Sequence, residues 1–202
     1  MEQFVFMYPI PENFEPELSI GSKLFKSELN IEKGFKGIYR TVLNECIDKR
    51  YRQNGFQINW AIFNHHDISD MIKRCEKDRI LEVGIGFNTP ATEINGKYQY
   101  PNEDYILDKL AESGEINSLR VAGFHAFDCV EKLAKRAYER GINSLVDEDL
   151  TEFLTHRMIM PGFKVDKYPT FNPFLLDINV KDRFFNARKK KPWFWQDYTQ
   201  IK

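Results

Sequence analysis

The chain has 202 residues, of which 42% are hydrophobic and 14% aromatic, which is enough apolar material for one domain with a sizeable core. Its 29 basic and 30 acidic residues give a formal net charge of -1, so no overall attraction to nucleic acid or an anionic membrane is expected. The longest apolar runs are far shorter than a membrane span, and the opening MEQFVFMYPIPENF lacks the basic start and cleavage site of a signal peptide. These features predict a cytoplasmic protein with no membrane or nucleic-acid partner.

The three cysteines, Cys46, Cys75 and Cys129, are far apart in the sequence and form no CxxC pair. This spacing excludes a zinc ribbon and a thioredoxin-like motif, and an odd number of thiols in a chain of this size argues against a disulfide framework. We expect no metal ion and no cofactor, and each thiol is judged by its own surroundings.

Short apolar strands are expected along most of the chain. The run FVFMYPI is apolar and aromatic, and Pro9 and Pro11 end it, which indicates a buried strand. Residues 12–32 show no clear pattern. Four further strands are expected at FQINWAIF (56–63), RILEVGIGF (79–87), LRVAGF (119–124) and INSLV (142–146).

Segments with helical spacing of apolar residues alternate with these strands. They cover residues 33–55, 66–77, 104–114 and 129–141, the last with Gly141 as its expected C-terminal cap. Residues 88–104 are rich in turn-forming residues and are expected to form a loop. Strands that alternate with helices in this way predict an α/β fold in which a mostly parallel sheet is covered by helices on both faces.

The regular pattern ends at about residue 156, and the remainder is rich in proline and phenylalanine and closes with NARKKKPWFWQDYTQIK. A basic run beside aromatic residues could contact RNA or a membrane surface. The favoured interpretation is a solvated charge run whose aromatic side chains dock on the domain or on a neighbouring subunit. We therefore divide the chain into a domain at residues 1–155 and an extension at residues 156–202.

Cys129 follows the strand LRVAGF and a short connecting segment, and it opens the next expected helix. Ligands of parallel α/β sheets bind at the carboxyl ends of strands. Unpaired N–H groups and the dipole at a helix start lower the pKa of a thiol and can hold an oxyanion, whereas the neighbouring carboxylate of Asp128 acts in the opposite direction. From spacing alone, a nucleophilic cysteine and a small buried core residue both remain open interpretations.

The run GFHAFDCVEKLAKRAYERGINSLVDEDLT, residues 123–151, resembles the cysteine-hydrolase superfamily of isochorismatase and nicotinamidase. Members carry a glycine six residues before a Cys-Val pair, alanines along the following helix, a glycine after it and an aspartate after the next strand. The matching residues are Gly123, Cys129, Val130, Ala134, Ala137, Gly141 and Asp149. The resemblance implies a three-layer α/β/α sandwich with a mostly parallel, Rossmann-like sheet.

The resemblance also implies a mechanism, the hydrolysis of small-molecule amides through a thioester on Cys129. In the family an aspartate takes the proton of the thiol and a lysine polarises the site. The backbone N–H groups of Cys129 and His125 would hold the oxyanion, and the peptide bond between Phe124 and His125 is a candidate for the family's cis bond. Phe124, His125 and Ala126 would line the substrate. At the position of Ala126, members of the family usually carry a threonine.

Two positions depart from the family. If Phe14 is aligned with the phenylalanine that follows the family's first strand, Pro9 takes the place of the catalytic aspartate, and a proline accepts no proton. Glu12, Asp128 and His125 are the candidates to replace it. Lys97, in the expected loop, is the nearest match to the family's lysine.

Other polar residues have ordinary explanations in the sequence. The adjacent His65 and His66 stand where nicotinamidases bind a metal, but neighbouring residues of a strand face opposite ways, so a helix entry capped by Asp67 is favoured. Cys46 and Cys75 lie on apolar stripes and are expected in the core. A group of four acidic residues is expected at a turn and the first turn of a helix rather than in a cation site: Asp147, Glu148, Asp149 and Glu152.

Three functions from different classes follow from these observations. The first is a cysteine hydrolase that acts on an amide or related acyl group of a small molecule. The second is a catalytically silent protein of the same fold that binds a small molecule or a partner protein. The third is a redox-sensing thiol protein. Family members often form oligomers, so a homo-oligomer in which the extension closes a neighbour's site is a further expectation.

Overall fold

A computed structural model of the chain describes residues 1–25, 34–84 and 102–196. Its centre is a five-stranded sheet in the order β3-β2-β1-β4-β5, in which every neighbouring pair is parallel. The strands are β1 (Glu2–Met7), β2 (Gln57–Ile62), β3 (Arg79–Glu82), β4 (Ser118–Gly123) and β5 (Asn143–Thr151). Since the chain begins in the middle of the sheet and winds outward in both directions, the carboxyl ends of β1 and β4 meet at the point where the winding direction changes.

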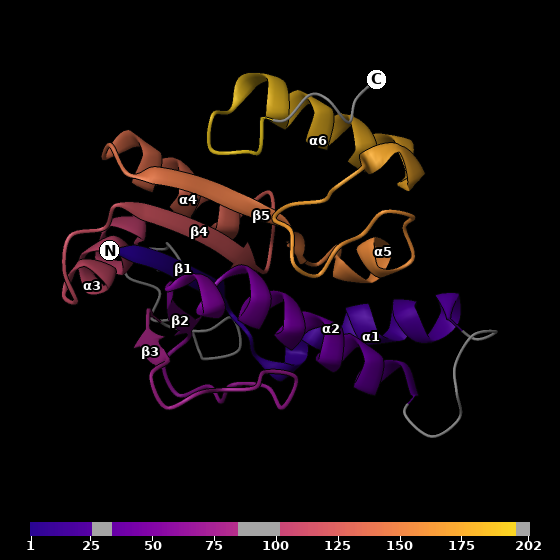
Figure 1. Ribbon diagram of the computed structural model, residues 1–202, viewed down its shortest axis with the longest axis horizontal. Coiled ribbons are helices and arrows are strands. Elements are labelled where there is room, and N and C mark those ends of the chain that lie inside the picture. The colour runs from indigo at the N-terminus through magenta and orange to yellow at the C-terminus, as the bar shows by residue number, and fades with distance from the viewer. Residues whose placement is uncertain (26–33, 85–101, 197–202) are drawn as a thin grey trace, which may run out of the picture.

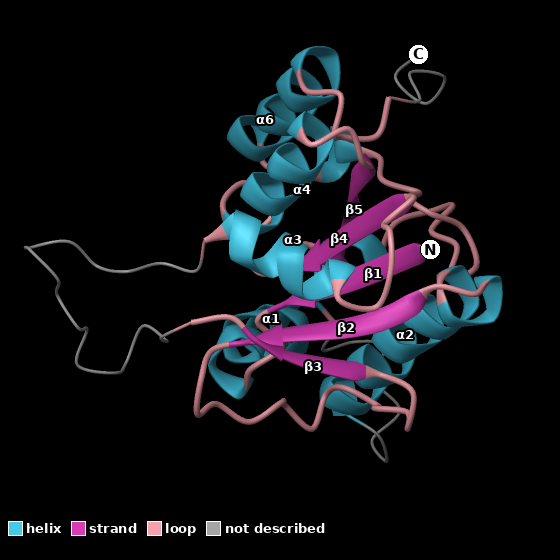
Figure 2. Cartoon of the chain, turned by 90° about the vertical axis from the view of Figure 1, so that its left-hand side faces the viewer, coloured by secondary structure: helices cyan, strands magenta, loops and turns pink. Residues whose placement is uncertain are grey.

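Helices cover both faces of this sheet (Figure 1). One face carries α1 (Pro11–Leu24) and α2 (Gly34–Arg50), and the other carries α3 (Glu103–Ala111), α4 (Cys129–Glu139) and α6 (Ile178–Lys190). Figure 2 shows the same layers from the side. The remaining elements are short: η1 (Arg52–Asn54), α5 (Leu154–Met158) and η2 (Pro173–Leu175). The predicted α/β/α sandwich with a parallel, Rossmann-like sheet is confirmed.

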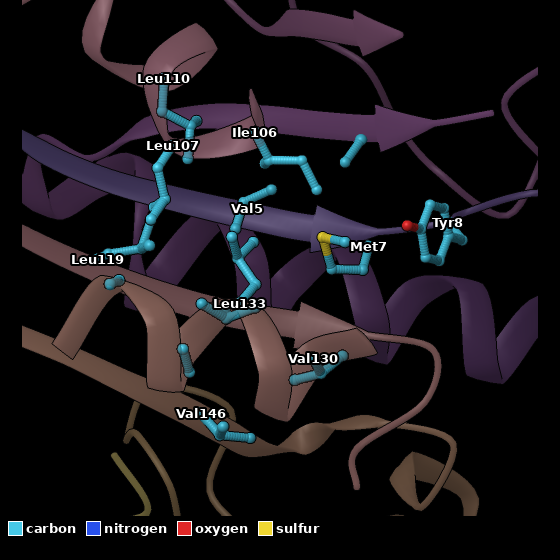
Figure 3. Close-up of a cluster of buried hydrophobic side chains, with 14 of the residues drawn as sticks. Val5, Met7, Tyr8, Ile106, Leu107, Leu110, Leu119, Val130, Leu133 and Val146 are labelled. Carbon is cyan, nitrogen blue, oxygen red and sulfur yellow. The ribbon is translucent and has the colours of Figure 1, made fainter. Parts of the chain in front are cut away.

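Strand alternation divides the core into two parts. On β1, Val5 and Met7 face α3 and α4, whereas Phe4 and Phe6 face α1 and α2. Figure 3 shows the first of these two clusters, with Val130 and Leu133 of α4 packed below the strand. Both faces of the central strand are buried, which explains why its sequence is a continuous apolar run and not an alternating one.

Residues 66–77, expected to form a helix capped by Asp67, form turns instead. The side chain of Asn44 on α2 supplies hydrogen bonds that a helix would otherwise supply. Its amide nitrogen donates to the carbonyl of Met71 at 2.8 Å, and its oxygen accepts the N–H of Lys73 at 2.7 Å. The prediction of a helix was wrong because partners from outside the segment satisfy its backbone groups.

The acidic run of residues 147–149 was expected at a turn and a helix start, and that prediction is wrong, because β5 continues through it to Thr151. All three carboxylates are fully buried. Asp147 and Asp149 face α2, where Arg50 lies 3.3 and 2.9 Å from them. Glu148 points to the opposite face and pairs with Arg188 of α6 at 2.5 Å. Successive residues of β5 thus form ion pairs with an arginine side chain in each of the two helical layers.

The C-terminal part of the chain packs on the sheet that precedes it. Phe184 of α6 and Phe194 are fully buried in the cluster that contains Val5 and Met7, and the carbonyl of Trp193 accepts a hydrogen bond from the N–H of Val146 on the edge strand at 2.9 Å. Lys191 of the basic run pairs with Glu131 of α4 at 2.6 Å. Phe184 and Phe194 therefore pack on residues that precede them in the same chain. Within the described residues, no helix combines the length and the apolarity needed to cross a bilayer.

Replacing Arg188 by methionine should test the buried ion pair. The variant leaves Glu148 buried without its cation, so we expect the free energy of unfolding, measured with urea, to fall by about 3–5 kcal/mol. The double variant Arg188→Met, Glu148→Leu should recover most of this loss because no charge remains buried. Lys189→Met, at an exposed position of the same helix, is the control and should change stability by less than about 0.5 kcal/mol. Equal losses in the single and double variants would contradict this account.

Candidate functional site

The candidate site lies where β1 and β4 end side by side. Gly123, the last residue of β4, has a φ of +102°, and a Cβ at this position would lie 2.2 Å from the carbonyl oxygen of Met7. Only glycine permits this approach. The next N–H, that of Phe124, donates to the same carbonyl at 3.0 Å. The segment that leads to Cys129 is therefore attached directly to the end of β1.

The backbone N–H groups of this segment form the next part of the site. The peptide bond between Phe124 and His125 is cis, as predicted. The carbonyl of His125 accepts the N–H groups of Asp128 and Val130 at 3.1 and 3.2 Å. Within the described part of the chain, the N–H groups of His125 and Cys129 have no acceptor of their own. These are the two groups that the resemblance assigns to an oxyanion.

Glu152 holds the residue between these two donors. Its carboxylate accepts the N–H of Ala126 at 2.8 and 3.1 Å, and its Oε1 lies 3.9 Å from Nδ1 of His125. Ala126 is fully buried and its N–H is occupied, so it offers neither a side chain nor a donor to a ligand. The sequence predicted Glu152 at a helix start. Its hydrogen bond with the backbone of Ala126, 26 residues earlier, could not be predicted because no spacing pattern connects the two.

Three polar side chains lie close together at the first turn of α4. Oδ2 of Asp128 lies 3.8 Å from Sγ of Cys129, within reach of a hydrogen bond to sulfur. Asp128 is the N-cap residue, and its side chain makes no capping bond, which leaves the carboxylate to face the sulfur. Nζ of Lys132 lies 2.5 Å from the other oxygen of this carboxylate. An acid, a thiol and an ammonium group are thus assembled at positions i, i+1 and i+4 of one helix start.

The thiol of Cys129 is not acidic in the resting protein. Its pKa is raised to about 11, chiefly by burial and also by the charges of Asp128 and Glu103, whereas Lys132 opposes them. The sequence left two opposing effects open, the helix start, which lowers the pKa, and Asp128, which raises it. Partial burial between two carboxylates outweighs the field of the helix start. The thiol therefore keeps its proton near neutral pH and needs a base when it reacts.

A tyrosine, not an acid, follows directly after β1. The side chain of Tyr8 is buried, and its ring lies just beyond the arrowhead of the strand (Figure 3). Burial raises the pKa of its hydroxyl, and the neighbouring Cys129 adds to this effect. Pro9 is buried next to it, and its carbonyl accepts the N–H of Ser69 at 2.8 Å. The sequence alignment drew attention to Pro9 and missed Tyr8. The sequence feature that could have pointed to Tyr8 is an aromatic residue at the end of a buried strand, but that feature is also typical of core packing.

Of the three candidates for a base, Asp128 is the one with a contact to the sulfur among the described residues. Glu12 is exposed on α1, and His125 faces Glu152. Lys97 lies outside the described residues.

The other singled-out residues lie elsewhere. No three acidic, histidine or cysteine side chains of the described ranges gather into a metal-binding group around His65 and His66. Cys46 is fully buried in the cluster across the sheet from Cys129. Cys75 lies among the turns before β3 and is half-buried. All three thiols are free, and the sheet separates Cys46 from Cys129, so these two are not placed to form a disulfide.

A second buried carboxylate, that of Glu17 on α1, interacts electrostatically with Glu152. No hydrogen-bond partner for its Oε2 is present in the described ranges. Burial raises its pKa to about 7, the charge of Glu152 raises it further, and a hydrogen bond with Thr155 lowers it. Burial also raises the pKa of Glu152, while the N–H of Ala126 and the nearby His125 and Arg183 lower it.

Comparisons with known proteins give a similarity to solved structures and no match at the level of sequence. No protein-family model matches the sequence, and no curated protein matches it significantly. Among solved structures, the chain is similar to the crystal structure of N-carbamoylsarcosine amidase from Thermoplasma acidophilum, with 16% sequence identity and a TM-score of 0.43 over 93% of this chain and 92% of that chain. A similarity of this extent identifies no activity, so the proposed function depends on the residues of this chain.

The charges beside the sulfur make opposite predictions for two variants. Asp128→Asn removes a negative charge, so the pKa of Cys129 should fall below about 11 and iodoacetamide should label it about three- to tenfold faster near pH 9. Lys132→Gln removes the opposing positive charge and should slow labelling. Peptide mass spectrometry measures both rates, and unlabelled Cys46 reports that the fold is intact. Shifts of the same sign in both variants would contradict the assignment.

The buried carboxylate of Glu17 predicts a pH dependence of stability. Since its pKa is about 7 in the folded protein and 4.5 for an unperturbed glutamate, unfolding releases its proton between these pH values. The free energy of unfolding should therefore decrease as the pH rises through this window. Glu17→Gln cannot ionise, so it should lose less stability between about pH 5 and pH 8 and be more stable at the higher pH by about 1–3 kcal/mol. Urea unfolding measures this, with the exposed Glu15→Gln as control. Parallel pH curves for the wild type and Glu17→Gln would exclude this role.

Proposed function

We propose that the protein is a cysteine hydrolase that cleaves an amide or related acyl group of a small molecule, with Cys129 as nucleophile. The observation that carries this proposal is the carboxylate of Asp128, 3.8 Å from the sulfur, in a chain whose aligned aspartate position holds a proline. The free N–H groups of His125 and Cys129 support it, because an acyl-transfer site needs donors for the oxyanion. Cys129 also lies near the carboxyl ends of β1 and β4, the edge at which parallel sheets bind ligands.

The reaction proceeds through a thioester. As the sulfur attacks the carbonyl carbon, the thiol proton moves to Asp128 and the carbonyl oxygen becomes an oxyanion held by the two N–H groups. The carbon–nitrogen bond then breaks, and the proton on Asp128 passes to the leaving amine. Water attacks the thioester with its proton accepted by Asp128, and the acid is released as the proton returns to the sulfur.

Lys132 supplies the cation of the site. It pairs with Asp128 at 2.5 Å, and this pairing raises the pKa of its ammonium group, so the group stays charged while the thiol reacts. A cation at this distance stabilises the ionised carboxylate that accepts the proton. Lys132 thus takes the part that the resemblance assigns to a lysine elsewhere in the chain.

A second candidate function is binding without catalysis. The observation that favours it is the pair of groups at the end of β1, where a proline and a phenol stand in place of an acid. The raised pKa of the thiol points the same way, because a resting thiolate is absent near neutral pH. In this case the site would hold a small molecule, or a segment of a partner protein, without a covalent step.

Hydrolysis of a panel of small primary amides and N-carbamoyl compounds distinguishes the two functions. We expect amine or ammonia release by the wild type, none by Cys129→Ala, and a rate lower by about 10²–10⁴-fold in Asp128→Asn, because general-base assistance is lost. Intact mass spectrometry of a quenched reaction should show the acyl group on Cys129. Cys75→Ala, away from the site, is the control and should keep full activity.

The opposite results would favour the binding protein. If no compound of the panel is hydrolysed while a panel member still raises the melting temperature of both the wild type and Cys129→Ala, the hydrolase proposal fails and binding stands. Equal hydrolysis by the wild type and Cys129→Ala would place the reaction at another group.

A further inference from the structure

We infer that Glu152 is a positioning residue, whose carboxylate fixes the segment of residues 124–129 and thereby the direction in which the N–H groups of His125 and Cys129 point. The inference rests on the proposed function for its catalytic meaning, but the position of the segment can be tested without a substrate. The contacts of the carboxylate are with the backbone of Ala126 and the ring of His125, so it acts through the segment and not on the reacting atoms.

The register of the sheet brings Glu152 to this segment. β4 and β5 are parallel neighbours, and Gly123 at the end of β4 lies opposite Thr151 at the end of β5. Glu152 is the next residue after Thr151, so it leaves the sheet beside the residues that follow Gly123. Strand pairing therefore determines where this carboxylate lies, because the two chain segments leave the sheet together.

The bond between the carboxylate and the segment is sheltered from water. The N–H of Ala126 donates to both oxygens of Glu152, at 2.8 and 3.1 Å. Ala126 is fully buried and the side chain of Glu152 is 20% exposed, so solvent is poorly placed to replace this acceptor. A hydrogen bond to an ionised acceptor is stronger than one between neutral groups, and a buried N–H without an acceptor is costly. The carboxylate therefore fixes the peptide group of Ala126 firmly.

Two aromatic side chains hold the segment on either side of this bond. Phe124 is buried in the cluster beneath α1 and α2, and Phe127 packs on α6, with 4.6 Å between its ring centroid and that of Phe184. Apolar contacts of this kind are not directional, so they hold the two rings without fixing the peptide groups between them. The bond from Ala126 to the carboxylate supplies the missing direction. The adjacent N–H of His125, which has no acceptor within the described residues, is thereby held in one orientation.

Glu152→Met tests the position of the segment, because it removes the acceptor and keeps a side chain of similar length. With isotopically labelled alanine and nuclear magnetic resonance, we expect the amide proton of Ala126 to exchange with solvent about tenfold faster or more, since a hydrogen bond to a charged group is lost. Glu152→Gln keeps an acceptor oxygen and should restore most of the protection. Glu139→Met, at an exposed carboxylate at the far end of α4, is the matched control and should leave this amide unchanged.

The kinetic test separates positioning from a general effect on stability. If amides are hydrolysed, Glu152→Met should lower kcat by about tenfold or more with KM nearly unchanged, because misdirected N–H donors weaken the binding of the oxyanion and not of the substrate. Glu152→Gln should recover most of the lost rate. Circular dichroism and urea unfolding check that both variants are folded.

The outcomes separate this inference from the proposed function. An Ala126 amide that exchanges in folded Glu152→Met as in the wild type would overturn the inference, whether or not the protein is a hydrolase. Faster exchange together with no hydrolysis of any amide by the wild type would support the positioning of the segment and reject the hydrolase. If amides are hydrolysed, an unchanged kcat in Glu152→Met would also overturn the inference.

Glu152→Gln decides the matter if Glu152→Met does not fold. It replaces a charged acceptor by a neutral one, so the amide proton signal of Ala126 should shift because the hydrogen bond becomes weaker. The same signal in the wild type and Glu152→Gln would show that the carboxylate does not hold this N–H, and the inference would fail.

Discussion

The ion pair between Glu148 and Arg188 connects the edge of the sheet to the chemistry of the site. Both side chains are fully buried, so each charge depends on the other, and separating them would leave an uncompensated charge in the core. The pair anchors α6 on β5, and Phe184 of α6 then packs on Phe127 at 4.6 Å between ring centroids. Phe127 stands two residues before Cys129. A charge pair at the edge of the sheet thus supports the segment that leads to Cys129.

The site itself combines groups that oppose one another electrostatically. A thiol in partial burial beside the carboxylate of Asp128 resists ionisation, and the same carboxylate is the group that can take its proton. Lys132 pairs with the other oxygen of that carboxylate at 2.5 Å. In the proposed hydrolase, the thiol therefore keeps its proton until a carbonyl is bound, in contrast to sites that rely on a resting thiolate.

Much of the fold could be predicted because its signals are local. The apolar runs of β1, β2 and β4 and the apolar stripe of α4 appear directly in the sequence, and alternation of strand and helix then leaves few topologies. Residues 66–77 were predicted wrongly because Asn44, from another helix, satisfies their backbone. The acidic run of β5 was predicted wrongly because its arginine partners, Arg50 and Arg188, are 97 and 40 residues away in the chain.

The sequence by itself determined the parallel sheet and the position of Cys129 at the first turn of a helix after a buried strand, because spacing and strand order are properties of the chain. The cis peptide bond before Cys129 was expected only from the family resemblance. Only the tertiary structure decided which groups surround the sulfur. Tyr8 lies 121 residues before Cys129 in the chain, and the two residues belong to the same core region because β1 and β4 are paired neighbours. The pKa of the thiol was likewise outside the reach of sequence, since burial and the charges of α3 and α4 set it together.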